Sequence, residues 1–321
     1  MTNNNLSEIV EQLHKAQNIA VFCHARPDGD ALGAGLALYT ALKNAGKCVV
    51  MCCEDLPPDK FSFMPSMTNV RRGLPSKTEY DTFISVDCAD ISRMGVFADA
   101  FFKFSGTTIN IDHHISNKGF AKYNYVYECT ASCELLTEIL LAAGFEITAE
   151  IANLLMLGLI TDSGNFTHRD VSEKTFNIAS KLRAYGADVT AINYNMFSRQ
   201  TKTRALLYAS VINKLRFALD DKLTFIIIKQ EDLEKFGADK SLTEGFVDFP
   251  LSIDGVEVSV SMLEVKRRQY KISFRSKSAV NVNAVASTFG GGGHILASGC
   301  MLFGELEEVI EKITYAVYQN L

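Results

Sequence analysis

NIAVFCHARPDGD, at residues 18–30, is the stretch that decides the fold class of this chain. Its first part, 18–23, is a short apolar run typical of a buried strand, and a helical period follows over 29–45. His24, Asp28 and Asp30 lie on the turn between the two. In an open parallel sheet, ligands bind just beyond the carboxyl ends of the strands, so this turn is a candidate binding site.

The same alternation of strand and helix continues through the first part of the chain. Apolar runs predict further strands at 47–53, 82–87 and 107–112. Helical periods predict further helices at 131–143, 149–159 and 172–185. Strands that alternate with helices predict an α/β domain whose mostly parallel sheet is covered by helices on both faces.

The pattern changes after residue 188, which divides the chain into two domains. Residues 189–210 are helical and polar, without strands, and we interpret them as a linker. Asp220-Asp221 lies between two apolar runs and signals a hairpin. We therefore predict an N-terminal α/β domain at 1–188, a helical linker at 189–210 and a smaller C-terminal α/β domain at 211–321.

Composition places the chain among ordinary globular proteins. It has 321 residues, 47% of them hydrophobic and 21% charged, which argues against intrinsic disorder. The net charge of −5 argues against a large basic face that coats duplex nucleic acid. Eight cysteines without a CxxC pair indicate reduced thiols in a cytoplasmic protein and argue against a zinc site. The most apolar stretch, 151–160, is too short to span a bilayer, so we expect no membrane partner.

Three more segments end in acidic or imidazole groups. Asp87 ends the run at 82–87, and Asp112-His113-His114 ends the next strand. Asp162 follows the helical run that closes at Ile160. Each aspartate taken alone is more simply an ordinary cap or turn residue, but together with the first turn they favour one common site.

Charge arithmetic indicates what such a site needs. Asp28, Asp30, Asp87 and Asp162 would bring four negative charges together, and like charges at close range cannot all stay ionised unaided. Two divalent cations would neutralise them. Mixed carboxylate and imidazole ligands suit manganese, with magnesium or cobalt as alternatives. A carboxylate shared by two ions roughly 3.5–4 Å apart is typical of two-metal phosphoester hydrolysis.

These motifs resemble those of the DHH phosphoesterases, a family named for its Asp-His-His motif. The C-terminal part resembles the DHH-associated domain, and the chain is most similar to the bacterial nanoRNase and 3′-phosphoadenosine 5′-phosphate phosphatase type within the family. The matching segments are His24-x-x-x-Asp28-x-Asp30, Asp87, Asp112-His113-His114, Thr161-Asp162-Ser163-Gly164, Phe274-Arg275-Ser276 and Phe289-Gly290-Gly291-Gly292-Gly293-His294.

The resemblance implies a role for each matching residue. One metal ion would be held by His24 and Asp28 and bridged through Asp87 to a second, whose site Asp30, His113 and Asp162 would complete. The catalytic residues would be Asp112, which orients a ligand, and His114, which faces the substrate phosphate. The expected substrate contacts are Arg93, Arg275, Ser276, Gly291, Gly292, Gly293 and His294.

Two of these regions keep a simpler alternative. Glycines alone more often form a flexible surface turn, but His294 directly after them and Arg275 on an alternating strand favour substrate recognition. His168 follows Asp162 closely enough to touch substrate, although a loop histidine is more often merely exposed.

We therefore expect a two-metal, manganese-dependent phosphoesterase that hydrolyses short nucleotides in the crevice between the two domains. The expected substrates are oligoribonucleotides of a few residues, pApA and 3′-phosphoadenosine 5′-phosphate, and the resemblance also suggests a homodimer. One alternative is a pyrophosphatase or polyphosphatase of the same superfamily. Another is a non-catalytic nucleotide-binding regulator, which predicts a lost metal ligand, and none is missing.

Overall fold

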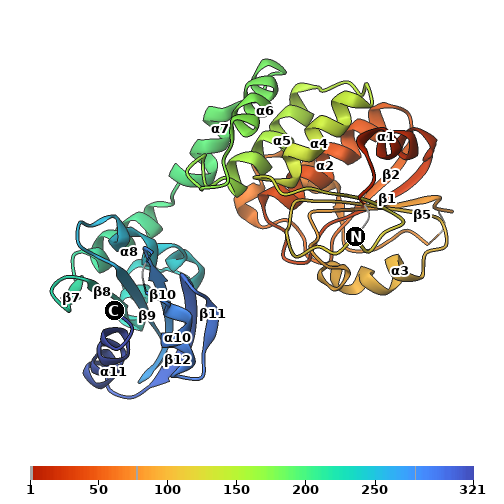
Figure 1. The fold of residues 1–321 in the computed structure, drawn as a ribbon. Helices are drawn as coiled ribbons and strands as arrows, with labels where there is room; N and C mark the ends of the chain where they lie inside the picture. Colours follow the sequence, from red (N-terminus) through yellow and green to blue (C-terminus); the bar gives the residue numbers. More distant parts are fainter. Residues whose placement is uncertain (1–2, 77–78, 279) are drawn as a thin grey trace. The chain divides into compact units, whose positions relative to one another are not determined.

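The computed structural model describes residues 3–76, 79–278 and 280–321. The chain forms two compact units, Met1–Arg199 and Gln200–Leu321 (Figure 1). The division falls inside the segment 189–210 that the sequence assigns to a linker. That segment contains α7 (Val189–Asn193), a π-helical turn at Tyr194–Ser198 and most of α8 (Lys202–Ile212), which continues two residues beyond it.

The first unit is built on a six-stranded sheet in which every neighbouring pair is parallel. The strand order is β3-β2-β1-β4-β5-β6, so the chain leaves β1 toward one edge and later returns to pair β4 on its other side. The switch point between β1 and β4 is where open α/β sheets bind ligands. The strands are β1 (Asn18–Phe22), β2 (Cys48–Cys52), β3 (Val70–Arg71), β4 (Thr82–Val86), β5 (Thr107–Asp112) and β6 (Tyr123–Val126).

Helices cover both faces of this sheet, as expected for a doubly wound fold (Figure 1). Successive strand side chains point to opposite faces, so Ile19 and Val21 join one core while Ala20 and Phe22 join the other. The first face carries α1 (Leu6–Lys15), α2 (Gly29–Asn44), α4 (Ser132–Ala142) and α5 (Ala149–Asp162), with α6 (Glu173–Ala184) and α7 against them; the second face carries α3 (Ala98–Lys103) and the 3₁₀ segment Ile91–Phe97. The predicted α/β fold is confirmed.

Glycines let α2 pack unusually close to α5. A Cβ atom on Gly33 would collide with the Leu154 carbonyl, and one on Gly158 would collide with Asp30 and the sulfur of Cys133. These collisions involve backbone or fully packed groups, so only glycine fits. The close crossing brings the start of α2, with Asp30, against the end of α5.

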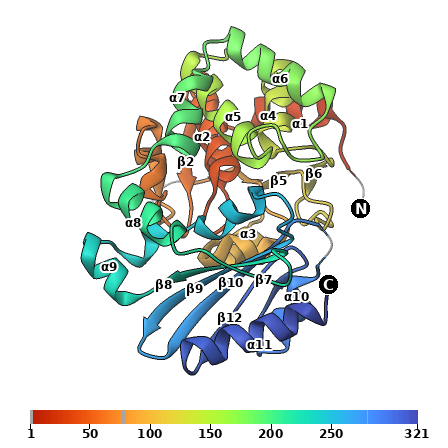
Figure 2. The same cartoon turned by 90° about the vertical axis from the view of Figure 1, so that its left-hand side faces the viewer.

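The second unit is a mixed six-stranded sheet of order β11-β12-β10-β9-β8-β7, in which only the β8–β9 pair is parallel. One face packs on α10 (Val282–Ser287) and α11 (Leu306–Tyr318), and the other packs on α8 and α9 (Gln230–Phe236) (Figure 2). The strands are β7 (Arg216–Ala218), β8 (Leu223–Ile228), β9 (Val258–Lys266), β10 (Gln269–Ser276), β11 (Gly292–His294) and β12 (Ala297–Phe303).

Three details differ from the sequence expectations. The helix predicted at 149–159 continues to Asp162, so this aspartate ends a helix instead of following it. Residues Gly292–His294 form the edge strand β11 and not a surface turn. The short elements β3, β6, α3 and α9 were not predicted, because segments of seven residues or fewer show too little periodicity to be recognised.

No helix in the described part of the chain is both long and apolar enough to cross a membrane. All eight cysteines are unpaired thiols, and six of them are buried.

Candidate metal centre

The predicted metal ligands meet at the carboxyl edge of the first sheet, around the switch point between β1 and β4. His24 follows β1, and Asp28 and Asp30 open α2. Asp87 follows β4, and His113 follows β5. Asp162 reaches the same place from the last turn of α5. Segments far apart in sequence therefore place oxygen and imidazole donors side by side.

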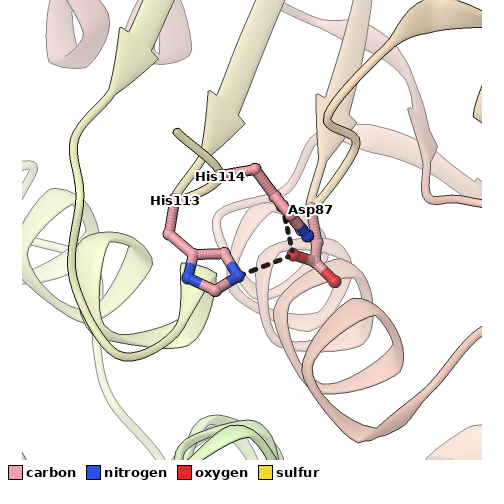
Figure 3. A group of neighbouring side chains, drawn as sticks. All are labelled: Asp87, His113 and His114. Atoms are coloured by element: carbon pink, nitrogen blue, oxygen red, sulfur yellow. Dashed lines mark ion pairs between the residues drawn. The ribbon is translucent and has the colours of Figure 1, made fainter. Parts of the chain in front are cut away.

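Asp87 lies at the centre of this cluster with its two carboxylate oxygens facing different histidines. Oδ2 lies 3.5 Å from Nε2 of His24, and Oδ1 lies 3.6 Å from Nε2 of His113. Oδ1 is also 3.7 Å from Nδ1 of His114, and Figure 3 shows the rings of both neighbouring histidines paired with this carboxylate. Asp87 adopts a left-handed backbone conformation (φ 54°), which turns its side chain sharply out of β4.

The donor atoms form overlapping sets, each compact enough to surround one ion. In one set, Nε2 of His24 lies 3.5 Å from Oδ2 of Asp28 and equally close to Asp87. In the other, Nε2 of His113 lies 3.2 Å from Oδ2 of Asp162. The sets with donor atoms within 4.8 Å of one another are His24–Asp28–Asp87, Asp30–His113–Asp162 and Asp87–His113–His114.

The two carboxylate oxygens of Asp28 have different partners, one in helix α2 and one in the donor cluster. Its Oδ1 accepts hydrogen bonds from the backbone N–H groups of Asp30 (3.1 Å) and Ala31 (3.0 Å), as an N-cap does. Its Oδ2 faces His24. The cap interpretation of this residue therefore accounts for one oxygen and leaves the second for a ligand.

Backbone carbonyls fix the tautomers of two histidines. Nδ1 of His24 lies 2.8 Å from the Ala25 carbonyl, and Nδ1 of His113 lies 3.0 Å from the Cys129 carbonyl. A carbonyl can only accept, so Nδ1 carries the proton in each neutral ring. Nε2 is then the basic atom, and in both rings it points at the carboxylates, as in histidines that bind metals.

The pKa values of two aspartates reflect the crowding of negative charge in the cluster. Burial, together with the carboxylates of Asp87 and Asp162, raises the pKa of Asp30 well above its usual range. Burial also raises the pKa of Asp162 to about 6, against the opposing effect of His113. Such a set favours bound cations.

The pKa values of two histidines are raised as well, but for an imidazole this shift favours the charged form. Burial disfavours the charged ring of His24, but hydrogen bonding to Asp28 and Asp87 outweighs it and raises the pKa to about 10. For His113, burial is likewise outweighed by Asp30 and Asp87, and its pKa rises to about 9. In the absence of metal, protons on these rings supply the positive charge that the acids require. The donor set therefore fits divalent ions with oxygen and imidazole ligands.

The amino end of α4 makes contacts that the sequence did not predict. The backbone N–H groups of Ser132 and Cys133 donate to Asp30 Oδ2 (2.6 Å) and Oδ1 (3.0 Å). The Ser132 hydroxyl donates to Oδ1 of Asp87 (2.9 Å). Residues 131–143 were predicted as a helix, but nothing in the sequence gave its direction toward the sheet edge.

Asp112 lies behind His114 and holds its ring. Its Oδ1 is 2.8 Å from Nδ1 of His114, and this hydrogen bond raises the pKa of the imidazole. Asn117, which the sequence also missed, donates to the other oxygen of Asp112 (2.6 Å). Asp112 is fully buried and belongs to none of the three sets.

Arg93 and His168 border the cluster through main-chain contacts. The Arg93 carbonyl accepts a hydrogen bond from Ala25 N–H (2.7 Å), next to His24, while its side chain is exposed. Nδ1 of His168 lies 2.8 Å from the carbonyl of Asp162.

The predicted substrate contacts of the second unit line up across its sheet. Register pairs both Arg275 on β10 and His294 on β11 with Ala297 of the intervening strand. Nε of Arg275 lies 3.1 Å from Oδ1 of Asp248, and Gly291, Gly292 and Gly293 lead into His294. Ser276 points to the other face, where its buried hydroxyl accepts from Val280 N–H (3.2 Å).

Comparison with known families identifies two domains in the chain. Residues 18–159 match the DHH family, N-terminal domain, and residues 209–319 match the DHHA1 domain. The chain therefore carries a DHH N-terminal domain followed by a DHHA1 domain. The predicted resemblance to DHH phosphoesterases, with their associated C-terminal domain, is confirmed.

Curated DHH relatives extend over nearly the whole chain. A bifunctional oligoribonuclease and PAP phosphatase NrnA from Thermus thermophilus is 29% identical, over 94% of this chain and 90% of its own. The protein of the same name from Bacillus subtilis is 25% identical, over 92% and 93% respectively.

Solved structures show the same fold. An exopolyphosphatase-related protein from Bacteroides fragilis superposes with a TM-score of 0.84 at 27% identity and covers 98% of this chain and 95% of its own. RecJ in complex with Mn²⁺ from Thermus thermophilus has a TM-score of 0.51 at 15% identity over 99% of this chain and 55% of its own, a likeness of fold alone.

Proposed function

We propose that this DHH phosphoesterase hydrolyses short nucleotides with two divalent ions, most favourably manganese. The position of Asp87 carries the proposal: one oxygen faces His24 and the other faces His113. A carboxylate that spans two histidine groups is suited to bridge two ions.

Two of the three compact sets would each hold one ion. The first ion would be held by His24, Asp28 and Asp87, and the second by Asp30, His113, Asp162 and Asp87. Divalent ions held there would polarise a phosphoryl oxygen and lower the pKa of bound water.

Hydrogen bonds within the protein hold the proposed site residues in position. Asp112 fixes the His114 ring so that its other nitrogen is available to a substrate phosphate oxygen, which a protonated imidazole can bind. The amide groups at the start of α4 hold Asp30, and the Ser132 hydroxyl holds Asp87. Ligands held this way need no reorganisation on binding.

The substrates proposed are oligoribonucleotides of a few residues, pApA and 3′-phosphoadenosine 5′-phosphate. The support is the names of the relatives from Thermus thermophilus and Bacillus subtilis, together with an intact donor set. We further propose that one substrate engages the metal cluster and the Arg275–His294 row at the same time. A polyphosphatase is the second candidate, because the similar Bacteroides fragilis protein is described as exopolyphosphatase-related.

A substrate panel tests the proposal. The purified chain is assayed with manganese on a pentaribonucleotide, pApA, 3′-phosphoadenosine 5′-phosphate, pyrophosphate and polyphosphate, and products are identified by chromatography. We expect turnover of the three nucleotides, lost by orders of magnitude in Asp87→Ala but kept in Asp99→Ala, which removes an exposed carboxylate of α3. Turnover of polyphosphate alone would favour the second candidate, and nucleotide binding without hydrolysis would indicate a regulator.

A further inference from the structure

A cavity of about 470 Å³ opens on one face of the second unit, over strands β9 and β10. Its floor is formed by strand residues and its wall by the segment that contains the 3₁₀ turns Lys240–Thr243 and Phe246–Ser252. All of its lining belongs to the second unit, so its shape does not depend on the first. This cavity contains Arg275, but most of its lining has no role in the proposed hydrolysis.

The floor of the cavity is polar because the strand register places polar side chains of β9 and β10 on the same face of the sheet. Lys271, Ser273 and Arg275 alternate with the buried Ile272 and Phe274 along β10, so they share the face opposite α10 and α11. On β9, Ser261 pairs with Ser273, and Leu263 pairs with Lys271. Hydroxyl groups thus lie between two cationic side chains.

The lining holds more cations than acids, in a protein of net charge −5. Lys240, Lys271 and Arg275 line the cavity together with one acid, Glu244, and Arg275 is paired with Asp248 of the wall segment. In the part of the chain that the structure describes, the ammonium groups of Lys240 and Lys271 form no ion pair and no hydrogen bond, and the neighbouring Asp239 interacts with the charge of Lys240. Lys214, in contrast, lies 2.6 Å from an oxygen of Asp232. Two lysines without an ion pair, beside serine hydroxyls, are suited to an anion.

The wall is held in place by two arginines. Nη2 of Arg204, on α8, donates to the Glu244 carbonyl (2.6 Å), and its guanidinium lies 4.7 Å from the centre of the Phe246 ring. Arg275 ties the floor to the same segment through Asp248. The cavity is therefore a built feature of the fold.

Lys271 and Arg275 are four residues apart on one strand, so their Cα atoms are about 13 Å apart. One phosphate cannot easily satisfy both side chains, whereas a chain of phosphodiesters can. The volume is also far larger than a single phosphate needs. These features favour a single-stranded oligonucleotide over a free phosphate ion.

We propose that this cavity binds the phosphodiester backbone of the oligonucleotide substrate away from the cleaved bond, with Lys240 and Lys271 as its phosphate contacts. The proposal rests on the proposed function, because it assigns a part of the same substrate. Ser261 and Ser273 would hydrogen-bond phosphate or ribose oxygens. The contacts carry no base specificity, so they would favour longer oligonucleotides over 3′-phosphoadenosine 5′-phosphate without regard to sequence.

Binding without catalysis tests this assignment. The full chain is kept in a chelator, and a fluorescein-labelled penta-adenylate is titrated by anisotropy between 50 and 200 mM salt. Each phosphate contact contributes about 0.7 to the slope of log affinity against log salt for single strands. We expect Lys271→Gln and Lys240→Gln each to lower that slope by about 0.7 and to weaken binding about five- to tenfold at 50 mM salt. Lys271→Arg should keep the wild-type slope.

Lys312→Gln is the matched control, because Lys312 lies exposed on α11, the helix that packs on the opposite face. An unchanged slope in both cavity variants would overturn the proposal, as would an equal fall in Lys312→Gln. Inorganic phosphate that binds in a Lys271-dependent way, while oligonucleotide binding does not depend on Lys271, would overturn it too. The assay involves no hydrolysis, so a changed slope would support the cavity even if the substrate panel contradicts the phosphoesterase.

Discussion

Asp87 shows how a single residue can carry both strain and function. A left-handed backbone at a residue other than glycine costs of order 1–3 kcal/mol and persists where the surroundings enforce it. Here the backbone N–H of Asp87 donates to the Ile111 carbonyl (3.0 Å), and Ser132 holds the carboxylate. The strained conformation turns the carboxylate toward His24 and His113.

Removal of the Ser132 hydroxyl should weaken metal binding without loss of the fold. Ser132→Ala leaves Asp87 without its neutral donor, and the loss of such a supporting contact typically costs 10- to 100-fold in metal affinity. We expect that loss in Mn²⁺ titrations by calorimetry, with rescue by Ser132→Thr. Thr137→Val, which removes a hydroxyl one turn later that bonds only the Cys133 carbonyl, should have no such effect. Equal affinities of Ser132→Ala and Thr137→Val would contradict the assignment.

Metal binding should release protons from the two buried histidines. The pKa values of His24 and His113 are raised to about 10 and about 9, so both rings are protonated at pH 7.5 without metal. Binding needs their Nε2 lone pairs and would also displace any proton on Asp30, whose pKa is raised, so about two protons or more should leave per chain. Apparent affinity should therefore rise as the pH rises from 7 toward 10. Calorimetry in buffers of different ionisation enthalpy measures this release, and identical binding enthalpies in all buffers would refute it.

The same pKa values set the pH dependence of stability without metal. Both histidines have folded-state values above the ordinary 6.5, so their pairing with the acids contributes fully below pH 6.5. That contribution should be lost as the pH rises through about 9 and 10. Thermal unfolding in a chelator should show the melting temperature falling as the pH rises across this range. With manganese in place of the chelator, the melting temperature should fall less.

At the scale of elements, the sequence predicts the main strands and helices and their convergence. The acidic groups at 28–30, 87 and 112–114 follow apolar runs, and parallel strands end at one edge, so their meeting follows from topology. The contacts from α4 could not be predicted, because they depend on the direction in which that helix meets the sheet. Asp162 was predicted to follow a helix, but it is the last residue of that helix. The edge strand β11 could not be predicted, because glycine has no preference for strands.

Close packing of α2 on α5 should make Gly33 sensitive and Gly35 tolerant to substitution. A Cβ on Gly33 meets the backbone carbonyl of Leu154, whereas one on Gly35 meets the end of the flexible Met51 side chain. Gly33→Ala should lower the free energy of unfolding by about 1–3 kcal/mol. Gly35→Ala should change it by about 1 kcal/mol or less, because the helix gains propensity while Met51 shifts. Denaturant titration compares the two, and equal effects would show that the helices can move apart.

At the scale of the whole molecule, the proposed metal chemistry and the proposed substrate recognition fall in different units. Every donor of the metal cluster belongs to Met1–Arg199, and Arg275, His294 and the cationic cavity belong to Gln200–Leu321. Binding energy from remote parts of a substrate can position its reacting group. The second unit should thus affect nucleotides more than small esters.

Arg275→Ala and His294→Ala should separate these two roles. We expect dinucleotide hydrolysis to fall about 100-fold, because a misplaced reacting group loses rate of that order. Slow hydrolysis of p-nitrophenyl phosphate should change little, and bound manganese should stay at the wild-type level. The measurement is the ratio of the two activities in each variant. A parallel loss on both substrates would mean that the second unit acts on the metal cluster or on the fold.

The most direct test of the central claim is manganese anomalous diffraction from crystals of the chain grown with Mn²⁺. The account predicts two anomalous peaks in the first unit. One should lie among His24, Asp28 and Asp87 and the other among Asp30, His113 and Asp162, with the carboxylate of Asp87 touching both. A single peak, or two peaks of which Asp87 contacts only one, would contradict the two-metal centre.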